Sequence, residues 1–206
     1  MYTPPAFAED RPAVLHDLIR THPLGLLITA GASGLIANPL PFQLVVEPAG
    51  VVLRAHLSRG NSQLADLDGA ECLVVFQGAQ AYVSPSWYAT KAETGKVVPT
   101  WNYIIVQARG RARRVDDPAW LRAQIAALTG DQERGLTEPW TVDDAPADFI
   151  TTQIKGIGGV EIPVTHLDGK WKLSQNRNAA DRSGVVEGLK AVGKDDVAAL
   201  MTAFEP

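Results

Sequence analysis

The sequence of 206 residues contains a single cysteine, which excludes two common devices of small proteins. One cysteine cannot form an intramolecular disulfide or a zinc site built on several thiolates. Cys72 lies in an apolar run, so we expect a buried thiol and not a reactive one. The histidines share no HxH or HxxxH spacing, so the sequence predicts no metal centre; they are His16, His22, His56 and His166.

Excess positive charge is also missing, since 19 Lys and Arg stand against 23 Asp and Glu. Nucleic-acid binding would therefore need a local basic patch. Arg109, Arg111 and Arg113 alternate along a predicted strand and share one face, with Arg114 opposite. This stripe is either a site for phosphate, nucleic acid or an acidic partner, or the solvated outer face of a sheet. We do not expect direct DNA binding.

A leader and a membrane anchor are not predicted either. Residues 1–11 lack the basic and apolar regions of a signal peptide, so we expect a cytoplasmic protein. Residues 23–46 carry no charge over a length that could cross a bilayer, but prolines and glycines interrupt them repeatedly. The segment Gly31-Ala32-Ser33-Gly34 within them predicts a hairpin turn instead.

Short aliphatic runs bounded by Gly, Pro, Ser and Asn dominate the first 115 residues, and helical patterns dominate the remainder. Strands are predicted over 24–29, 34–46, 51–57, 72–76, 81–84, 100–115 and 160–167, with a loop over 85–99. Helices are predicted over 10–22, 61–67, from Asp116-Asp117-Pro118 onward, and over 148–155, 181–190 and 194–204. This order favours an α+β fold built on an antiparallel barrel over a parallel doubly wound sheet. No linker divides the chain, so we expect one domain over 1–206, with C-terminal helices from about residue 178.

The segment Gly156-Ile157-Gly158-Gly159-Val160-Glu161 superficially resembles a dinucleotide-binding loop. Glu161 stands where the motif needs its third glycine, and a strand follows instead of a helix. We interpret this segment as a glycine-rich turn.

Three groups of residues combine aromatic rings with polar and basic side chains. Between residues 76 and 103, aromatic side chains alternate irregularly with Ser84, Ser86, Thr100 and Asn102, which suits a planar heterocycle with a polar edge or, alternatively, a core cluster. These aromatics are Phe76, Tyr82, Trp87, Tyr88, Trp101 and Tyr103. Residues 54–61 end a strand with hydroxyl, guanidinium and free backbone N–H groups, which suit a phosphate monoester. Residues 169–177 add further cations and amides.

These blocks resemble a known family. The segments that carry the likeness are Ala81-Tyr82-Val83-Ser84-Pro85-Ser86-Trp87-Tyr88, Val98-Pro99-Thr100-Trp101-Asn102-Tyr103 and Lys172-Leu173-Ser174-Gln175-Asn176, with Met1-Tyr2 and Gly184-Val185-Val186-Glu187-Gly188-Leu189. Over about residues 1–190 the chain is similar to the PaiB family of FMN-binding negative transcriptional regulators. The resemblance implies an antiparallel split β-barrel like that of pyridoxamine-phosphate oxidases, with flanking helices, and a homodimer that holds FMN at the subunit interface.

The resemblance also assigns residues to the flavin. His56, Ser58, Arg59 and Asn61 would form the phosphate region, and Trp101 and Asn102 would approach the flavin or its ribityl chain. Lys172, Ser174 and Gln175 would complete the site. Ala6, Pro39 and Gln107 stand where the family pattern has histidine. These departures put histidine-dependent chemistry in doubt and leave it open whether FMN binding is weakened or abolished.

Two alternative functions stay open from the sequence. One is a flavin-dependent oxidoreductase, either a flavin reductase or an enzyme like pyridoxamine-phosphate oxidase, although no side chain is identified as its catalytic acid or base. The other is a regulatory interaction module that uses the barrel without flavin, with the arginine stripe as its contact surface.

Overall fold

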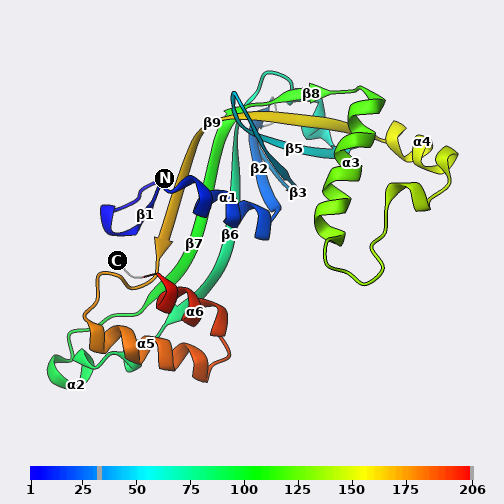
Figure 1. The fold of residues 1–206 in the computed structure, drawn as a ribbon. Coiled ribbons are helices and arrows are strands. Elements are labelled where there is room, and N and C mark those ends of the chain that lie inside the picture. The colour runs from blue at the N-terminus through cyan, green and yellow to red at the C-terminus, as the bar shows by residue number, and fades with distance from the viewer. Residues whose placement is uncertain (32–33, 205–206) are drawn as a thin grey trace. The chain divides into compact units, whose positions relative to one another are not determined.

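The computed structural model describes residues 1–31 and 34–204 and has the α+β class predicted from the sequence (Figure 1). The strands are β1 (Ala8–Glu9), β2 (Leu24–Gly31), β3 (Gly34–Pro41), β4 (Gln43–Glu47), β5 (Gly50–Ser58), β6 (Glu71–Val83), β7 (Thr100–Arg111), β8 (Arg113–Val115) and β9 (Ile157–Lys172). They follow the order β3-β2-β6-β7-β9-β5-β4, and β1 and β8 also pair with β9. The pairs β1–β9, β2–β3, β2–β6, β4–β5, β5–β9 and β8–β9 are antiparallel, as expected.

Helices occupy the segments between and after these strands. The α-helices are α1 (Pro12–Thr21), α2 (Thr90–Thr94), α3 (Pro118–Glu133), α4 (Ala147–Lys155), α5 (Ala179–Ala191) and α6 (Asp195–Ala203). Short 3-10 helices are η1 (Pro5–Phe7), η2 (Ser62–Asp66), η3 (Pro85–Trp87) and η4 (Val142–Asp144). Among the described residues, no helix combines the length and apolar character needed to cross a membrane.

The chain forms two compact units. The terminal unit contains residues 1–18, 77–106 and those from 168 onward, and the central unit contains residues 19–76 and 107–167. Helix α1 and strands β6, β7 and β9 each contribute residues to both units. Each unit is described by itself below.

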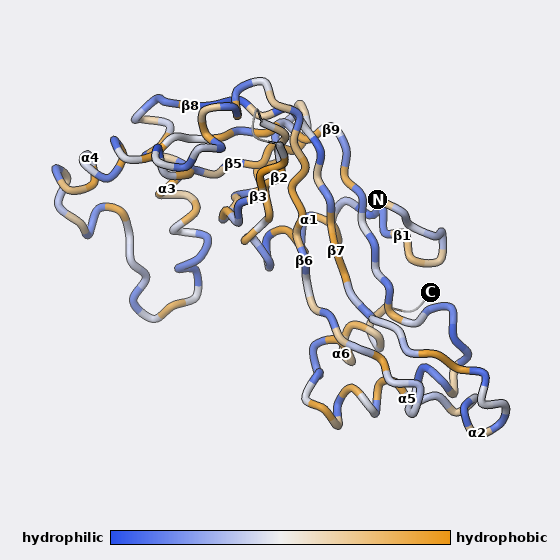
Figure 2. Tube along the Cα trace, turned by 180° about the vertical axis from the view of Figure 1, so that it is seen from behind, coloured by the Kyte–Doolittle hydropathy of each residue, from blue (hydrophilic) through white to orange (hydrophobic). Residues whose placement is uncertain are grey.

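The central unit is built around the hairpin of β2 and β3, which pair from Leu24 and Pro41 to Gly31 and Gly34. The predicted turn residues Ala32 and Ser33 between these strands lie outside the described residues. Figure 2 shows a long apolar stretch along β2, whose alternate residues are buried. Phe42 and Phe76 are fully buried and meet edge to face, with ring centroids 5.7 Å apart.

Helices α3 and α4 form a smaller core in the same unit. Asp117 caps α3 by accepting a hydrogen bond from the backbone N–H of Ala119, as its position before Pro118 predicts. Leu121 of α3 packs with Ile150 and Ile154 of α4 in one buried cluster.

The core of the terminal unit lies around α5 and α6. Val185, Leu189 and Met201 are buried on the facing sides of these helices. Two glycines of α5 let η3 approach closely: a Cβ at Gly188 would lie 2.3 Å from the ring of Trp87, and one at Gly184 would lie 2.1 Å from its backbone oxygen. The segment 85–99, which was predicted to be a loop, is partly helical, because it contains η3 and α2.

Several predicted element boundaries are wrong, and close packing explains two of them. The strands predicted over 72–76 and 81–84 are one strand, β6, in which Gly78 leaves room for Ile104, 2.6 Å from a Cβ built at that glycine. The long strand predicted over 100–115 is interrupted at Ala112, whose backbone exchanges hydrogen bonds with the loop residues Gly69 and Ala70.

The predicted glycine-rich turn at 156–161 is also wrong, because Ile157–Lys172 is one continuous strand, β9. Gly158 and Gly159 lie inside this strand, beneath bulky side chains. A Cβ at Gly158 would be 2.7 Å from Leu64, and one at Gly159 would be 2.4 Å from Trp120. These glycines serve close packing and do not form a turn.

Candidate functional site

The residues predicted to bind flavin lie in both compact units. His56, Ser58, Arg59 and Asn61, here called the turn set, belong to the central unit. Trp101, Asn102, Lys172, Ser174 and Gln175, here called the strand-end set, belong to the terminal unit. The structure thus brings together the members of each set.

The turn set connects the end of β5 to η2. The hydroxyl of Ser58 accepts a hydrogen bond from the N–H of Gly60 at 3.1 Å, and the side chain of Asn61 caps η2 by accepting from the N–H of Gln63 at 3.0 Å. The N–H of Arg59 donates to the oxygen of Gly156, and that of Asn61 donates to the oxygen of Ser58. The free backbone donors expected at this turn are therefore already occupied.

Arg59 already contacts a carboxylate. Its Nη1 lies 2.9 Å from Oδ1 of Asp116, and its Nε donates to the backbone oxygen of Lys155 at 3.0 Å. Hydrogen bonding from Arg114, and then from Arg59, lowers the pKa of Asp116, so this carboxylate is charged at neutral pH. An incoming phosphate would have to compete with Asp116 for the guanidinium.

His56 makes a hydrogen bond of the kind expected for a structural histidine. Its Nδ1 lies 2.8 Å from Oε1 of Gln124, a residue of α3 that is only 3% exposed. The side chain of His56 is half-buried. This contact favours the structural interpretation of His56 over a role facing the ligand.

The strand-end set has a buried polar centre. Asn102 is fully buried; its Oδ1 accepts from the hydroxyl of Ser174 at 3.1 Å, and its Nδ2 donates to Sδ of Met201 at 3.2 Å. Ser174 has a φ of 62°, the left-handed region that non-glycine residues rarely occupy. Gln175 folds back onto the chain, accepting from the N–H of Leu173 at 2.7 Å and donating to the oxygen of Trp171 at 2.5 Å. Its amide stabilises the turn and is not free for a ligand.

Lys172 stands among other cations. Its ammonium group donates to Oγ1 of Thr100 and, at 2.5 Å, to the backbone oxygen of Trp101. Burial lowers the pKa of Lys172, and the positive charges of Lys170 and Arg177 lower it further. The sequence groups Lys170 and Arg177 with Lys172 in the segment 169–177, but the resemblance did not assign them to the flavin site.

The predicted aromatic cluster is divided in the structure. Tyr82 and Trp101 are 47% and 51% exposed and meet edge to face with ring centroids 6.1 Å apart. Phe76 and Tyr88, in contrast, are buried. The exposed pair can stack on a planar ligand. Phe76 and Tyr88 belong to the core, which is the alternative interpretation of these aromatic residues.

The positions that depart from the family pattern lie in three different elements. Ala6 is exposed in η1, Pro39 is exposed on β3, and Gln107 is half-buried on β7. Over residues 1–31 and 34–204, no cluster of His, Cys, Asp and Glu is arranged to hold a metal ion. Cys72 is buried as predicted, and burial raises the pKa of its thiol to about 11.

The arginine stripe lies on the exposed face of β7 and β8, as its alternation predicts. Nη2 of Arg111 pairs with Glu71 at 2.7 Å, and Arg113 pairs with Glu161. Arg109 is also exposed. Because neighbouring carboxylates neutralise two of these arginines, the stripe has the character of a solvated outer face.

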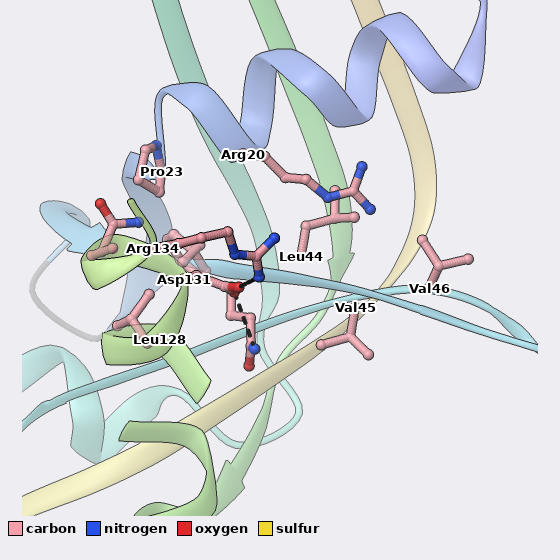
Figure 3. Close-up of a pocket in the computed structure, with 11 residues that line it drawn as sticks. Arg20, Pro23, Leu44, Val45, Val46, Leu128, Asp131 and Arg134 are labelled. Carbon is pink, nitrogen blue, oxygen red and sulfur yellow. Dashed lines mark hydrogen bonds and ion pairs between the residues drawn. The ribbon is translucent and has the colours of Figure 1, made fainter. Parts of the chain in front are cut away.

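A pocket of about 470 Å³ in the central unit contains none of the predicted site residues (Figure 3). Leu44 of β4 and Leu128 of α3 contribute apolar walls, and Arg20 of α1 lies at its margin. Asp131 accepts from Arg134 at 2.8 Å within the pocket. The size of this pocket and its mixture of apolar and charged walls suit a small amphipathic ligand. The charged residues at the ends of α1 and α3 gave no recognisable sequence motif.

Comparisons with known structures establish the fold. The flavocytochrome Anf3 from Azotobacter vinelandii matches with a TM-score of 0.61 at 13% identity, over 80% of this chain and 69% of that one. The FAD- and heme-binding protein from Mycobacterium smegmatis matches with a TM-score of 0.61 at 17% identity, over 85% and 78% of the two chains. The antiparallel split barrel expected from the sequence is confirmed.

Comparisons of sequence establish the family. The chain is 35% identical to an uncharacterized protein of Emericella nidulans over 95% of this chain and 92% of that one. It is 29% identical to protease synthase and sporulation protein PAI 2 of Bacillus subtilis, over 92% and 89%. The family described as "Putative FMN-binding domain" matches residues 1–166, which include the turn set, Trp101 and Asn102. The chain therefore belongs to this FMN-binding domain family and is related to PAI 2.

Proposed function

We propose that this protein is a cytoplasmic homodimer that binds FMN at its subunit interface and acts as a negative regulator of transcription, as the PaiB resemblance implies. Membership of the FMN-binding domain family is the observation that carries the cofactor proposal. The match includes the turn set, in which Arg59 is the side chain best suited to hold a phosphate.

Arg59 can reach a phosphate-bearing ligand if the phosphate displaces Asp116 from its guanidinium. The side chain is 40% exposed, and its guanidinium contacts Asp116 and Lys155 through Nη1 and Nε. Arg59 also borders a pocket of about 430 Å³ whose walls include Leu121 and Ile154. A volume of this size is within the usual range for small-molecule sites.

We assign the phosphate to the turn set, in which Ser58 and Arg59 would hold it in exchange for the contact with Asp116. Considered by itself, the terminal unit offers the exposed ring of Trp101, on which a planar group can stack. FMN, when bound, supplies redox chemistry of its own. The chain would contribute binding and orientation.

Replacement of Arg59 by alanine is expected to weaken FMN binding about 10- to 100-fold, which corresponds to one charge-assisted hydrogen-bonded contact. Riboflavin lacks the phosphate, so its affinity should change much less. The measurement is a titration of the purified apo protein with each flavin, followed by flavin fluorescence and visible absorbance.

Arg111→Ala is the matched control, because Arg111 is also an exposed, ion-paired arginine of the central unit. It should leave both affinities unchanged. Equal losses of FMN and riboflavin in Arg59→Ala would reject the phosphate role of Arg59, and no FMN binding at micromolar concentration by the unmodified protein would reject the cofactor proposal.

The regulatory role is proposed without direct contact to DNA. The formal net charge is −4, and Arg111 and Arg113 are paired with carboxylates. Salt-dependent duplex binding that disappears when the arginine stripe is substituted would overturn this part of the proposal. NADH or NADPH consumption in the presence of FMN would instead favour the oxidoreductase alternative.

A further inference from the structure

A small polar pocket lies beside the end of β9 in the terminal unit. It has a volume of about 50 Å³, which compares with about 30 Å³ for one water molecule in the liquid. Its walls contain two cations and no carboxylate; they are Thr100, Asn102, Lys172, Ser174, Asn176 and Arg177. The pocket therefore has room for one small group and not for a flavin ring.

Among residues 1–31 and 34–204, no acid pairs with the positive charges around the pocket. The ammonium groups of Lys170 and Lys172 lie 5.4 and 6.0 Å from the ring centroid of Tyr103, and the guanidinium of Arg177 lies 4.6 Å from that of Tyr88. Lys170 is only 9% exposed and donates to the backbone oxygen of Tyr2. Among the described residues, none of these three cations forms an ion pair with a carboxylate.

The acids of neighbouring segments have other partners. Asp168 pairs with the N-terminal amino group at 3.4 Å. Asp181 of α5 is 2% exposed and accepts hydrogen bonds from Thr90 and Asn178. Like charges gathered in a partly buried place repel one another, so an anion bound among them would be strongly favoured.

The wall of the pocket also contains a hydrogen-bond donor, the side-chain amide of Asn102, that has only a weak acceptor. Asn102 is fully buried, and its Nδ2 donates to the thioether of Met201, which is a weak acceptor. Ser174 is held at a positive φ by the turn that follows β9. Backbone conformations of this kind are often retained where they shape a binding site.

We propose that this pocket is an oxyanion site that takes a single phosphate or the terminal phosphate of a monoester, with Lys172 and Arg177 as its charged donors. Two cations in the wall, with Lys170 nearby, match a dianionic phosphate better than a carboxylate with one charge. Asn102, Lys172 and Ser174 of this pocket also belong to the strand-end set, but the proposed function assigns the FMN phosphate to Arg59. The phosphate here is therefore that of a separate ligand, and its binding can be measured without flavin.

The direct test is a titration of the full-length protein with inorganic phosphate at constant ionic strength, followed by calorimetry and by the amide NMR signals of Thr100, Ser174 and Asn176. Saturable binding that shifts these signals is expected, and Arg177→Gln should weaken it at least 10-fold, which is the loss of one charge-assisted contact. The matched control is Lys194→Gln, which removes the same charge from an exposed position of the terminal unit.

The outcomes separate this inference from the flavin proposal. Absence of saturable phosphate binding, or equal weakening by Arg177→Gln and Lys194→Gln, would overturn the oxyanion site whatever the flavin titrations show. Competition by FMN but not by riboflavin would support the oxyanion site, but it would assign its phosphate to the flavin and overturn both the separate ligand and the phosphate role of Arg59. Undiminished phosphate binding in the presence of FMN would support it with a separate phosphate ligand. Arg59→Ala should leave phosphate binding at this pocket unchanged.

Discussion

Replacement of Glu161 by alanine is expected to lower the free energy of unfolding by about 2 kcal/mol, less than for a fully buried ion pair because its partners Arg54 and Arg113 are 27% and 63% exposed. Glu161 is 8% exposed in β9 and accepts from two arginines. Its Oε2 lies 2.8 Å from Nε of Arg54, and its Oε1 pairs with Arg113. Alanine would leave Arg113 without a carboxylate partner, whereas Arg54 would keep its contact with Glu47 at 2.7 Å. Chemical denaturation at neutral pH measures the loss.

Glu71→Ala is the matched control for this prediction. Glu71 also pairs with an arginine, but the side chains of Glu71 and Arg111 are 74% and 68% exposed. Water and salt screen such a pair, so the expected loss is below about 1 kcal/mol. Similar losses in the two variants would show that burial of Glu161 adds nothing to its contribution.

The contribution of Glu161 should also depend on pH. Burial alone would raise the pKa of Glu161, but the hydrogen bonds and charges of Arg113 and Arg54 outweigh it, so the pKa lies below its ordinary value of 4.5. The unfolded chain then takes up this proton at a higher pH than the folded chain. The stabilisation is therefore complete above the unfolded value and is lost as the pH falls through the folded value. The difference in unfolding free energy between the unmodified protein and Glu161→Gln should shrink over that acidic interval and stay constant at neutral pH.

Gly184→Ala should destabilise the protein although the substitution raises helix propensity. Gly184 lies within α5, and a Cβ there would be 2.1 Å from the backbone oxygen of Trp87, which cannot rotate away as a side chain can. We expect a loss of about 1–3 kcal/mol, typical of overpacking, which exceeds the roughly 1 kcal/mol that alanine gains over glycine in a helix.

The matched control is Gly130→Ala in α3, where no described atom beyond the adjacent residues and the surrounding helix backbone lies within 4 Å of the added methyl group. Propensity then acts alone, and we expect a gain of up to about 1 kcal/mol. Thermal and denaturant unfolding of both variants should give shifts of opposite sign. If Gly184→Ala is instead more stable than the unmodified protein, η3 can shift away from the added methyl group at little cost, and its contact with α5 contributes little to the free energy of unfolding.

Local sequence signals predicted the elements whose ends depend on their own residues. Asp117 followed by Pro118 set the start of α3, and Asn61 set the start of η2, because capping and proline geometry act within a few residues. Short aliphatic runs divided by turn residues predicted the antiparallel hairpins, because both the strands and the turns between them depend on nearby residues. The combined motifs of the chain predicted the family and its split-barrel fold, which the comparisons establish.

Tertiary packing decided what those local signals could not. Gly158 and Gly159 read as a turn along the chain, yet they lie within β9 because Leu64 and Trp120, far away in sequence, occupy the space above them. Tertiary contacts also decided which of the polar residues have partners. The sequence by itself determined that the chain carries cations, amides and aromatic rings of the kinds a phosphorylated flavin needs. Only the tertiary structure paired Arg59 with Asp116 and gathered Lys172 and Arg177 in a pocket that no carboxylate of the described residues lines. Whether a charge is balanced depends on neighbours that folding brings from distant segments.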